Sequence, residues 1–216
     1  PTPNLDRLHA QSMSFTDAHS GSAVCSPTRY GLLTGRYAWR TRMKSGIVAK
    51  WGPPLIAADR VPLADVAHAA GLHTACIGKW HLGDQPVFLP TRQGFDSFLG
   101  LPYSDDMTRA TGQRIGERLR GNRWPPLPLL ENEHVIEAPA DRNTLTQRET
   151  AAAVKFIAAN RDNPFFLYLP HNMPGSSRAP FASKAFRGKS KNGAWGDAVE
   201  ELDWAAGEIF KALKKH

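Results

Sequence analysis

Apolar residues recur at helical spacing through much of the chain. In the segments 144–160 and 196–216 they fall on one face at intervals of three and four residues, which is typical of helices packed against a core. The same spacing predicts shorter helices over 3–12, 27–34 and 63–71. Short apolar runs predict strands over 13–19, 73–81 and 164–170.

Residues that begin and end helices agree with these boundaries. Asn4 is a candidate cap for the first helix. Ser26 is placed to cap the second helix, with Pro27 at its first position and Gly35 as its stop. Gly71 closes the third helix in the same way.

Helices that alternate with apolar strands predict an α/β fold, in which a mostly parallel sheet is flanked by helices. The segment 84–142 is long and rich in proline, glycine and charge, and is expected to be a loop or insertion around a site. The first and last predicted elements are helices without a flanking strand. Residues 1–216 are therefore expected to be the central part of a single catalytic domain, incomplete at both ends.

Composition narrows the class of protein. Of the 216 residues, 41% are hydrophobic and 22% charged, which is typical of a globular domain. No apolar run approaches the roughly 20 residues that span a bilayer. The net charge of +7 is scattered along the chain without a basic stripe, so it favours an anionic small substrate over nucleic acid. The chain starts without methionine, and its natural N-terminus is expected to lie further upstream.

The two cysteines, Cys25 and Cys76, are far apart and show no CxxC spacing, so they indicate neither a disulfide framework nor a zinc site. Cys25 directly precedes the predicted helix start at Ser26. Backbone N–H groups and the positive end of the helix dipole would favour an anion there. Arg29, one turn along, would add a fixed positive charge. The alternative is a small buried residue at a loop–helix junction, with Cys76 as core.

A second candidate pair lies at the end of the predicted strand 73–81. In an extended chain Lys79 and His81 point to the same side, with Trp80 opposite. An ammonium beside an imidazole can hold an anion and move a proton, and open α/β sheets place their ligands at strand ends.

Other polar residues follow predicted strands or lie in loops. His171 comes directly after the apolar run 164–170. Ser104, Asp105 and Asp106 lie together in a loop, where the two acids could bind a hard cation such as calcium or simply be solvated turn residues.

Taken together, these segments resemble a known family. "CSPTRYGLLTG" is similar to the sulfatase signature, and "TACIGKWHLG", "GLPYSDD" and "VEELDWAAGEI" resemble segments of arylsulfatase A-type enzymes. The resemblance covers essentially all 216 residues but only about the middle half of such an enzyme. It implies the alkaline phosphatase-like sulfatase fold and hydrolysis of aryl or carbohydrate sulfate esters.

The resemblance also implies residue roles. Cys25 would be oxidised by a maturation enzyme to formylglycine (3-oxoalanine), whose hydrate attacks the sulfur and then expels sulfate. Arg29 would orient that hydrate, Lys79 would neutralise the sulfate oxygens, and His81 would act as base. Ser104 would support the substrate site through hydrogen bonding.

The family's divalent metal, usually Ca²⁺, would be bound by the modified Cys25 together with acidic and amide residues that lie outside this chain. Asp105 and Asp106 do not match those ligands. Related chains usually carry histidine, the proton donor to the leaving alcohol, where this chain has Gly175. His171, four residues earlier, is the candidate replacement.

Three alternatives remain at this stage. A phosphonate or phosphodiester hydrolase of the same superfamily can share the Cys-x-Pro-x-Arg nucleophile. A catalytically incomplete anion-binding remnant would explain Gly175 and the missing ligands, and a basic nucleic-acid module would show salt-sensitive DNA affinity. By family, the protein is expected to be exported or lysosomal, and residues 1–216 are expected to be inactive by themselves.

Overall fold

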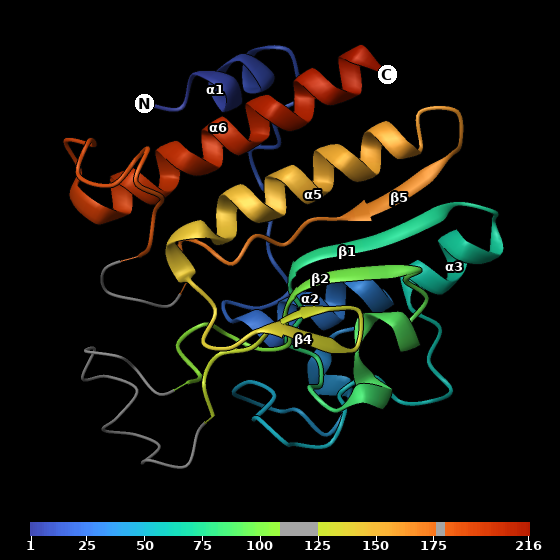
Figure 1. Cartoon of the computed structure of the whole chain (residues 1–216). Helices are drawn as coiled ribbons and strands as arrows, with labels where there is room; N and C mark the ends of the chain where they lie inside the picture. The colour runs from blue at the N-terminus through green and yellow to red at the C-terminus, as the bar shows by residue number, and fades with distance from the viewer. Residues whose placement is uncertain (109–124, 176–179) are drawn as a thin grey trace.

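A five-stranded sheet lies at the centre of the computed structural model, which describes residues 1–108, 125–175 and 180–216 (Figure 1). Its strands stand in the order β4-β3-β2-β1-β5. Their bounds are β1 His73–Lys79, β2 Ser97–Leu101, β3 Leu129–Glu131, β4 His134–Glu137 and β5 Phe165–Tyr168.

The sheet is mixed. Strand β1 pairs in parallel with β2 on one side and with β5 on the other, whereas β3 pairs antiparallel with both β2 and β4. The register aligns Cys76 with Phe98 in β2 and with Tyr168 in β5. The predicted α/β class is therefore confirmed. The parallel part of the sheet consists of β2, β1 and β5, with β1 in the middle.

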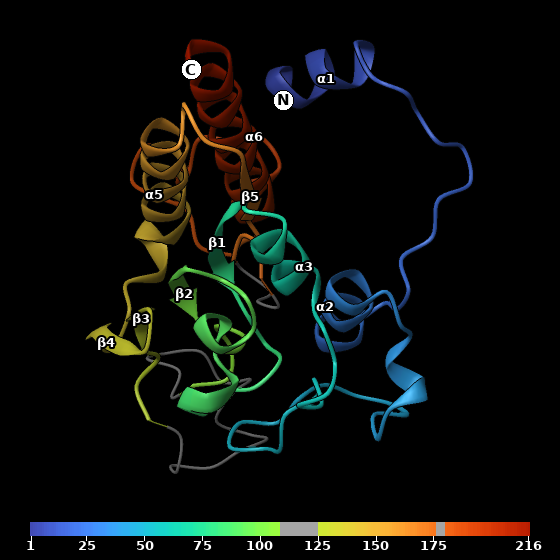
Figure 2. The ribbon, with the colours of Figure 1, turned by 90° about the vertical axis from the view of Figure 1, so that its right-hand side faces the viewer.

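Helices cover both faces of this sheet. Figure 2 shows α5 and α6 on one side of the strands and α2 and α3 on the other. The α-helices are α1 Pro3–Ala10, α2 Cys25–Thr34, α3 Leu63–Ala69, α5 Leu145–Ala159 and α6 Gly193–Lys215. Short 3₁₀ turns occur at Ala38–Arg40, Pro86–Phe88, Pro90–Arg92 and Arg142–Thr144. No helix in the described part of the chain is both long and apolar enough to cross a membrane.

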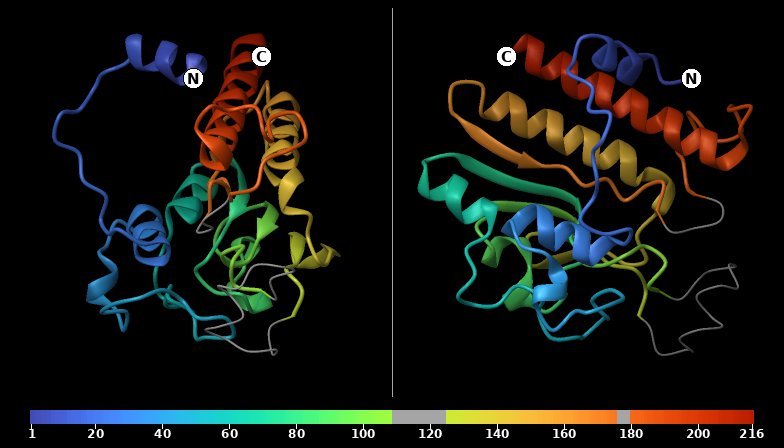
Figure 3. Two further views of the ribbon diagram at one scale, coloured as in Figure 1. Left: turned by 90° about the vertical axis from the view of Figure 1, so that its left-hand side faces the viewer. Right: turned by 180° about the vertical axis from the view of Figure 1, so that it is seen from behind.

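The two ends of the chain meet through α1 and α6. Figure 3 shows α1 lying along α6, joined to α2 by an extended segment. The Asp203 carboxylate on α6 accepts the backbone N–H groups of Asn4 at 3.0 Å and of Leu5 at 2.8 Å. The prediction that Asn4 caps this helix with its own side chain is wrong, because Asp203 supplies the acceptor and the Asn4 side chain donates to it instead.

Two segments differ from the sequence-based expectation. Residues 13–19, all of which the structure describes, form no strand, and Met13 and Phe15 are three-quarters exposed because no strand lies beside them. The segment 84–142 contains β2, β3 and β4 in its described portion, while 109–124 lie outside the described residues. These strands have only three to five residues, too few for a clear alternating pattern.

Strands β1 and β2 approach each other closely at a pair of glycines. Gly78 and Gly100 are aligned in the register, and a Cβ placed on Gly100 would lie 1.8 Å from the Gly78 carbonyl oxygen. Gly78 has a φ of +121°, and a Cβ there would lie 2.3 Å from the carbonyl oxygen of Pro170. Only glycine fits both positions, and the close contact fixes where β1 ends beneath the candidate site.

Candidate functional site

Cys25 is the first residue of α2 and is half-buried. Ser26 follows it and is fully buried, and its hydroxyl donates to the carbonyl oxygen of His81 at 2.9 Å. The same hydroxyl accepts the backbone N–H of Val48 at 3.0 Å. This serine therefore fixes the start of α2, and with it Cys25, against the segment that follows β1.

Arg29 lies one turn further along α2 and reaches the carboxyl ends of two strands. Its guanidinium donates to the carbonyl oxygen of Lys79 in β1 and hydrogen-bonds the hydroxyl of Tyr168 in β5. Burial raises the pKa of Tyr168 to about 12, while the Arg29 charge acts in the opposite direction. These two bonds hold the Arg29 guanidinium, the predicted fixed charge near Cys25, against the ends of β1 and β5.

Lys79, the last residue of β1, is 5% exposed, and its ammonium donates to the Ser104 hydroxyl at 3.0 Å. Burial lowers its pKa, opposed by the Cys25 side chain, and Arg29 lowers it further. The carboxylates of Asp105 and Asp106 raise it. Lys79 is therefore the centre of a charged cluster in which the structure brings together the residues predicted from three separate motifs.

His81 does not continue the alternation of the strand. Strand β1 ends at Lys79, and a φ of +61° at His81 turns the chain. The buried imidazole donates from Nε2 to the carbonyl oxygen of Val48 at 3.2 Å, which makes Nδ1 the ring nitrogen that can take up a proton. The prediction that the strand runs through His81 is wrong, so strand alternation does not place His81 and Lys79 on one side. His81 is instead held against the start of α2, since its carbonyl oxygen accepts from Ser26.

His171 follows β5, and its Nδ1 donates to the carboxylate of Glu149 at 2.8 Å. Glu149 lies on α5 and is 1% exposed. Sequence reasoning missed Glu149. The available signal was a single acidic residue on the otherwise uncharged buried face of a helix, where burial of a charge requires partners.

Asp105 and Asp106 have different surroundings. Asp105 is 1% exposed, whereas Asp106 is exposed to solvent. A Cβ added to Gly175, whose φ is +68°, would lie 2.9 Å from Oδ1 of Asp105. Position 175, where the resemblance leads one to expect histidine, is therefore strained for any side chain and already partly occupied by Asp105.

Calcium does not fit the described residues by themselves. No three His, Cys, Asp or Glu side chains gather into a possible metal site within residues 1–108, 125–175 and 180–216. Asp105 and Asp106, the candidate cation ligands, separate into one buried and one exposed carboxylate. The described residues alone therefore supply no metal-assisted step.

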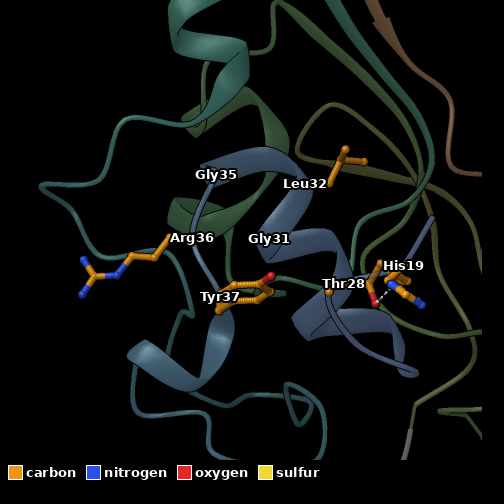
Figure 4. Close-up of a pocket in the computed structure, with 9 residues that line it drawn as sticks. His19, Thr28, Gly31, Leu32, Gly35, Arg36 and Tyr37 are labelled. Atoms are coloured by element: carbon orange, nitrogen blue, oxygen red, sulfur yellow. Dashed lines mark hydrogen bonds between the residues drawn. The ribbon is translucent and has the colours of Figure 1, made fainter. Parts of the chain in front are cut away.

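A hollow of about 500 Å³ opens along the other side of α2 (Figure 4). Thr28, Gly31, Leu32 and Gly35 form one wall, and Tyr37 lies opposite. As far as the structure describes the chain, its lining includes none of the predicted site residues. This hollow and the charged cluster around Lys79 are distinct features of the molecule.

The burial of Asp105 leads to a pH-dependent stability. Burial raises its pKa above the ordinary 3.8, opposed by the charges of Arg142 and Lys79. The stabilisation from neutral Asp105 is complete below its unfolded-state pKa and is lost as the pH rises through the folded-state value. Asp105→Asn should therefore gain stability relative to the parent as the pH rises from 4 to 7. Thermal unfolding across this range measures the difference.

Asp106→Asn is the matched control, because Asp106 is exposed. Its effect on the unfolding temperature should be small and independent of pH. An Asp105→Asn effect of constant size from pH 4 to pH 7 would contradict a raised pKa.

Comparisons with known proteins identify the family of the chain. The family model described as Sulfatase matches residues 1–216. Bovine arylsulfatase A is 36% identical over 225 residues, covering 98% of this chain and 43% of that protein. Pig N-acetylgalactosamine-6-sulfatase is 33% identical over 228 residues, covering 99% and 42%. The chain thus spans less than half the length of these curated relatives.

Solved structures show the same fold. One, described under glycosaminoglycan metabolism by Bacteroides thetaiotaomicron, superposes with a TM-score of 0.82 at 25% identity, covering 99% of this chain and 54% of that one. Another, Ps i-CgsB in complex with k-i-k-neocarrahexaose, has a TM-score of 0.75 at 26% identity, covering 99% and 49%. With a sequence match along its whole length and this fold, the chain belongs to the sulfatase family.

Proposed function

We propose that the protein of which these residues form part hydrolyses sulfate esters, with Cys25, oxidised to formylglycine, as the nucleophile. The observation that carries this proposal is the position of Cys25 at the positive end of α2, within electrostatic reach of the Lys79 ammonium. The hydrated aldehyde supplies two hydroxyls. One attacks sulfur and displaces the alcohol. The other then loses its proton and re-forms the aldehyde as sulfate leaves.

Positive charge at this site would bind and polarise the sulfate group. Lys79 is held by Ser104 and is placed to neutralise the sulfate oxygens, and Ser104 can hydrogen-bond the substrate as well. Arg29, anchored on Lys79 and Tyr168, would orient the modified Cys25 side chain. A buried cationic site strengthens these interactions, because the surrounding protein screens charge less than water does.

Two histidines would move protons. His81 is tied through Val48 and Ser26 to the start of α2, and its Nδ1 would accept the hydroxyl proton. His171 would donate a proton to the oxygen of the leaving alcohol as the S–O bond breaks. Ca²⁺ is the metal that membership of this family implies, but the described residues supply no site for it, so none of these roles depends on a metal ion.

The substrate class is proposed to be a carbohydrate or aryl sulfate. Two of the similar proteins are an N-acetylgalactosamine-6-sulfatase and a protein solved with a neocarrahexaose, which favours a sulfated sugar. A formylglycine-generating enzyme is the partner that Cys25 requires. By family, the protein would be exported or lysosomal.

The experiment is to express the full-length protein with a maturation enzyme, measure the mass of the peptide that contains Cys25, and assay an aryl sulfate against an aryl phosphodiester. We expect an aldehyde or its hydrate at Cys25 and faster sulfate release. Faster phosphodiester hydrolysis would assign the protein to the phosphohydrolases of the superfamily. An unmodified thiol with no release of either product would support the anion-binding remnant.

A further inference from the structure

Glu149 is a buried carboxylate with an unusual set of partners. It accepts hydrogen bonds from Nδ1 of His171 at 2.8 Å, from the backbone N–H of Asn172 at 3.3 Å, and from the Asn172 side-chain amide. All three donors come from two consecutive residues, His171 and Asn172, which follow the end of β5 at Tyr168 after two further residues. A single side chain of α5 therefore sets both the position and the ring orientation of His171 (α5 and β5, Figure 1).

The sheet register places His171 beside Lys79. The pairing of Cys76 with Tyr168 continues past the end of β5, since the backbone N–H of Lys79 donates to the carbonyl oxygen of Pro170 at 2.8 Å. This bond sets the backbone of His171 beside Lys79. Strand β5 itself ends at Tyr168, and the backbone N–H of His171 donates to the carbonyl oxygen of Leu169 at 3.2 Å, so a turn at Pro170 rather than the strand alternation orients the His171 side chain.

Exposure separates the two members of the pair. The His171 side chain is 17% exposed and the Glu149 side chain 1%. A small molecule can reach the imidazole but not the carboxylate. A carboxylate on Nδ1 fixes the tautomer and stabilises the protonated ring, so Nε2 becomes the nitrogen that exchanges a proton with whatever lies in front of it.

We propose that Glu149 is a positioning residue for proton transfer by His171. The inference rests on the proposed sulfate ester hydrolysis. When the S–O bond breaks, the alcohol oxygen keeps the bonding electron pair and takes the proton from Nε2 of His171. The ring becomes neutral and is reprotonated from water before the next turnover. Glu149 acts through His171 and touches neither the substrate nor the reacting atoms.

A purely structural role would not require the charge. A glutamine at position 149 would fill nearly the same volume, and its carbonyl oxygen could still accept the Asn172 side-chain amide while its NH₂ group faced Nδ1 of a neutral His171. Burying a carboxylate instead carries a large desolvation penalty unless charged or hydrogen-bonded partners offset it. The imidazolium form of His171 is such a partner, because its Nδ1 already contacts the carboxylate.

The test is Glu149→Gln in the full-length, matured protein, assayed with aryl sulfates whose leaving phenols range from strongly to weakly acidic. Weakly acidic phenols need the proton most. We expect kcat/KM to fall about 100-fold for the poorest leaving group and by no more than a few-fold for the best. The dependence of rate on leaving-group pKa should become steeper, and His171→Gln should steepen it in the same way.

Glu201→Gln is the matched control. Glu201 is also 1% exposed and accepts a backbone N–H, that of Ser183 at 2.9 Å, but it lies on α6. Its replacement should leave the leaving-group dependence unchanged. If Glu149→Gln does not fold, Glu149→Asp is the second variant. It keeps the negative charge but, being one methylene shorter, holds it further from His171. The dependence of rate on leaving-group pKa should then steepen less than in Glu149→Gln.

The outcomes separate the two levels of inference. A parent protein that releases no sulfate from any ester contradicts the proposed function and the role of Glu149 with it. An active parent whose Glu149 variants lose rate equally for every leaving group contradicts only the role of Glu149. Steepening in both the Glu149 and His171 variants, with none in Glu201→Gln, supports it.

Discussion

Cys25→Ala is expected to lower sulfate release by the full-length, matured protein at least about 10⁴-fold, because the substitution removes the proposed nucleophile. The methyl group cannot be oxidised to an aldehyde, while Lys79 and Ser104 keep their mutual hydrogen bond. Substrate binding should therefore persist, so the loss should lie in kcat. Steady-state release of sulfate from an aryl sulfate measures it.

Cys76→Ala is the matched control, since it removes the other cysteine. Cys76 is fully buried in β1, and burial raises its pKa, so it is a core thiol without nucleophilic character. Its loss should lower stability by about 1 kcal/mol and leave kcat nearly unchanged. Sulfate release by Cys25→Ala at the parent rate would refute the mechanism, whatever the control does.

Gly100→Ala is expected to destabilise the fold by about 4 kcal/mol or more, which is most of the stability of a domain at the low end of the usual range. The added Cβ would lie 1.8 Å from the Gly78 carbonyl oxygen, an impossible distance that only separation of β1 from β2 can relieve. Denaturant unfolding and the soluble yield measure the effect.

Gly31→Ala provides the comparison. Gly31 lies within α2, and its nearest outside atom would be 3.8 Å from an added Cβ. Alanine should be neutral there or stabilising by up to about 1 kcal/mol, because it favours a helix. Equal stability of the Gly100 and Gly31 variants would show that β1 and β2 can move apart at no cost.

Local patterns predicted the elements whose burial follows from their own sequence. Helices α5 and α6 show clear apolar periodicity, and Gly35 ends α2 in the left-handed conformation that its position suggests. Strands β3 and β4 escaped prediction because their pairing, not their composition, makes them strands. The run 13–19 has strand-like composition but no neighbour, and it remains extended and exposed.

In the candidate site, too, local motifs predicted some residues, while contacts between distant elements could not be predicted. Cys25, Arg29 and Lys79 belong to compact motifs that a single sequence displays. The contact between Glu149 and His171 joins residues 22 positions apart on different elements, and the burial of Asp105 depends on how Gly175 approaches it. Such features follow from the packing of α5 and β5 against β1, which no local pattern encodes.

The contact between α1 and Asp203 also has a consequence for biosynthesis. The carboxylate that receives the N–H of Leu5 lies 198 residues downstream, so a ribosome adding 5 to 20 residues per second needs roughly 10 to 40 s to supply it. Helix α1 is expected to stay undocked for that time, with the segment leading to Cys25 open to the proposed maturation enzyme. Protease cleavage within residues 11–24 can be compared between nascent chains arrested before and after Asp203. We expect cleavage to be faster in the shorter chains, in which α1 has no partner.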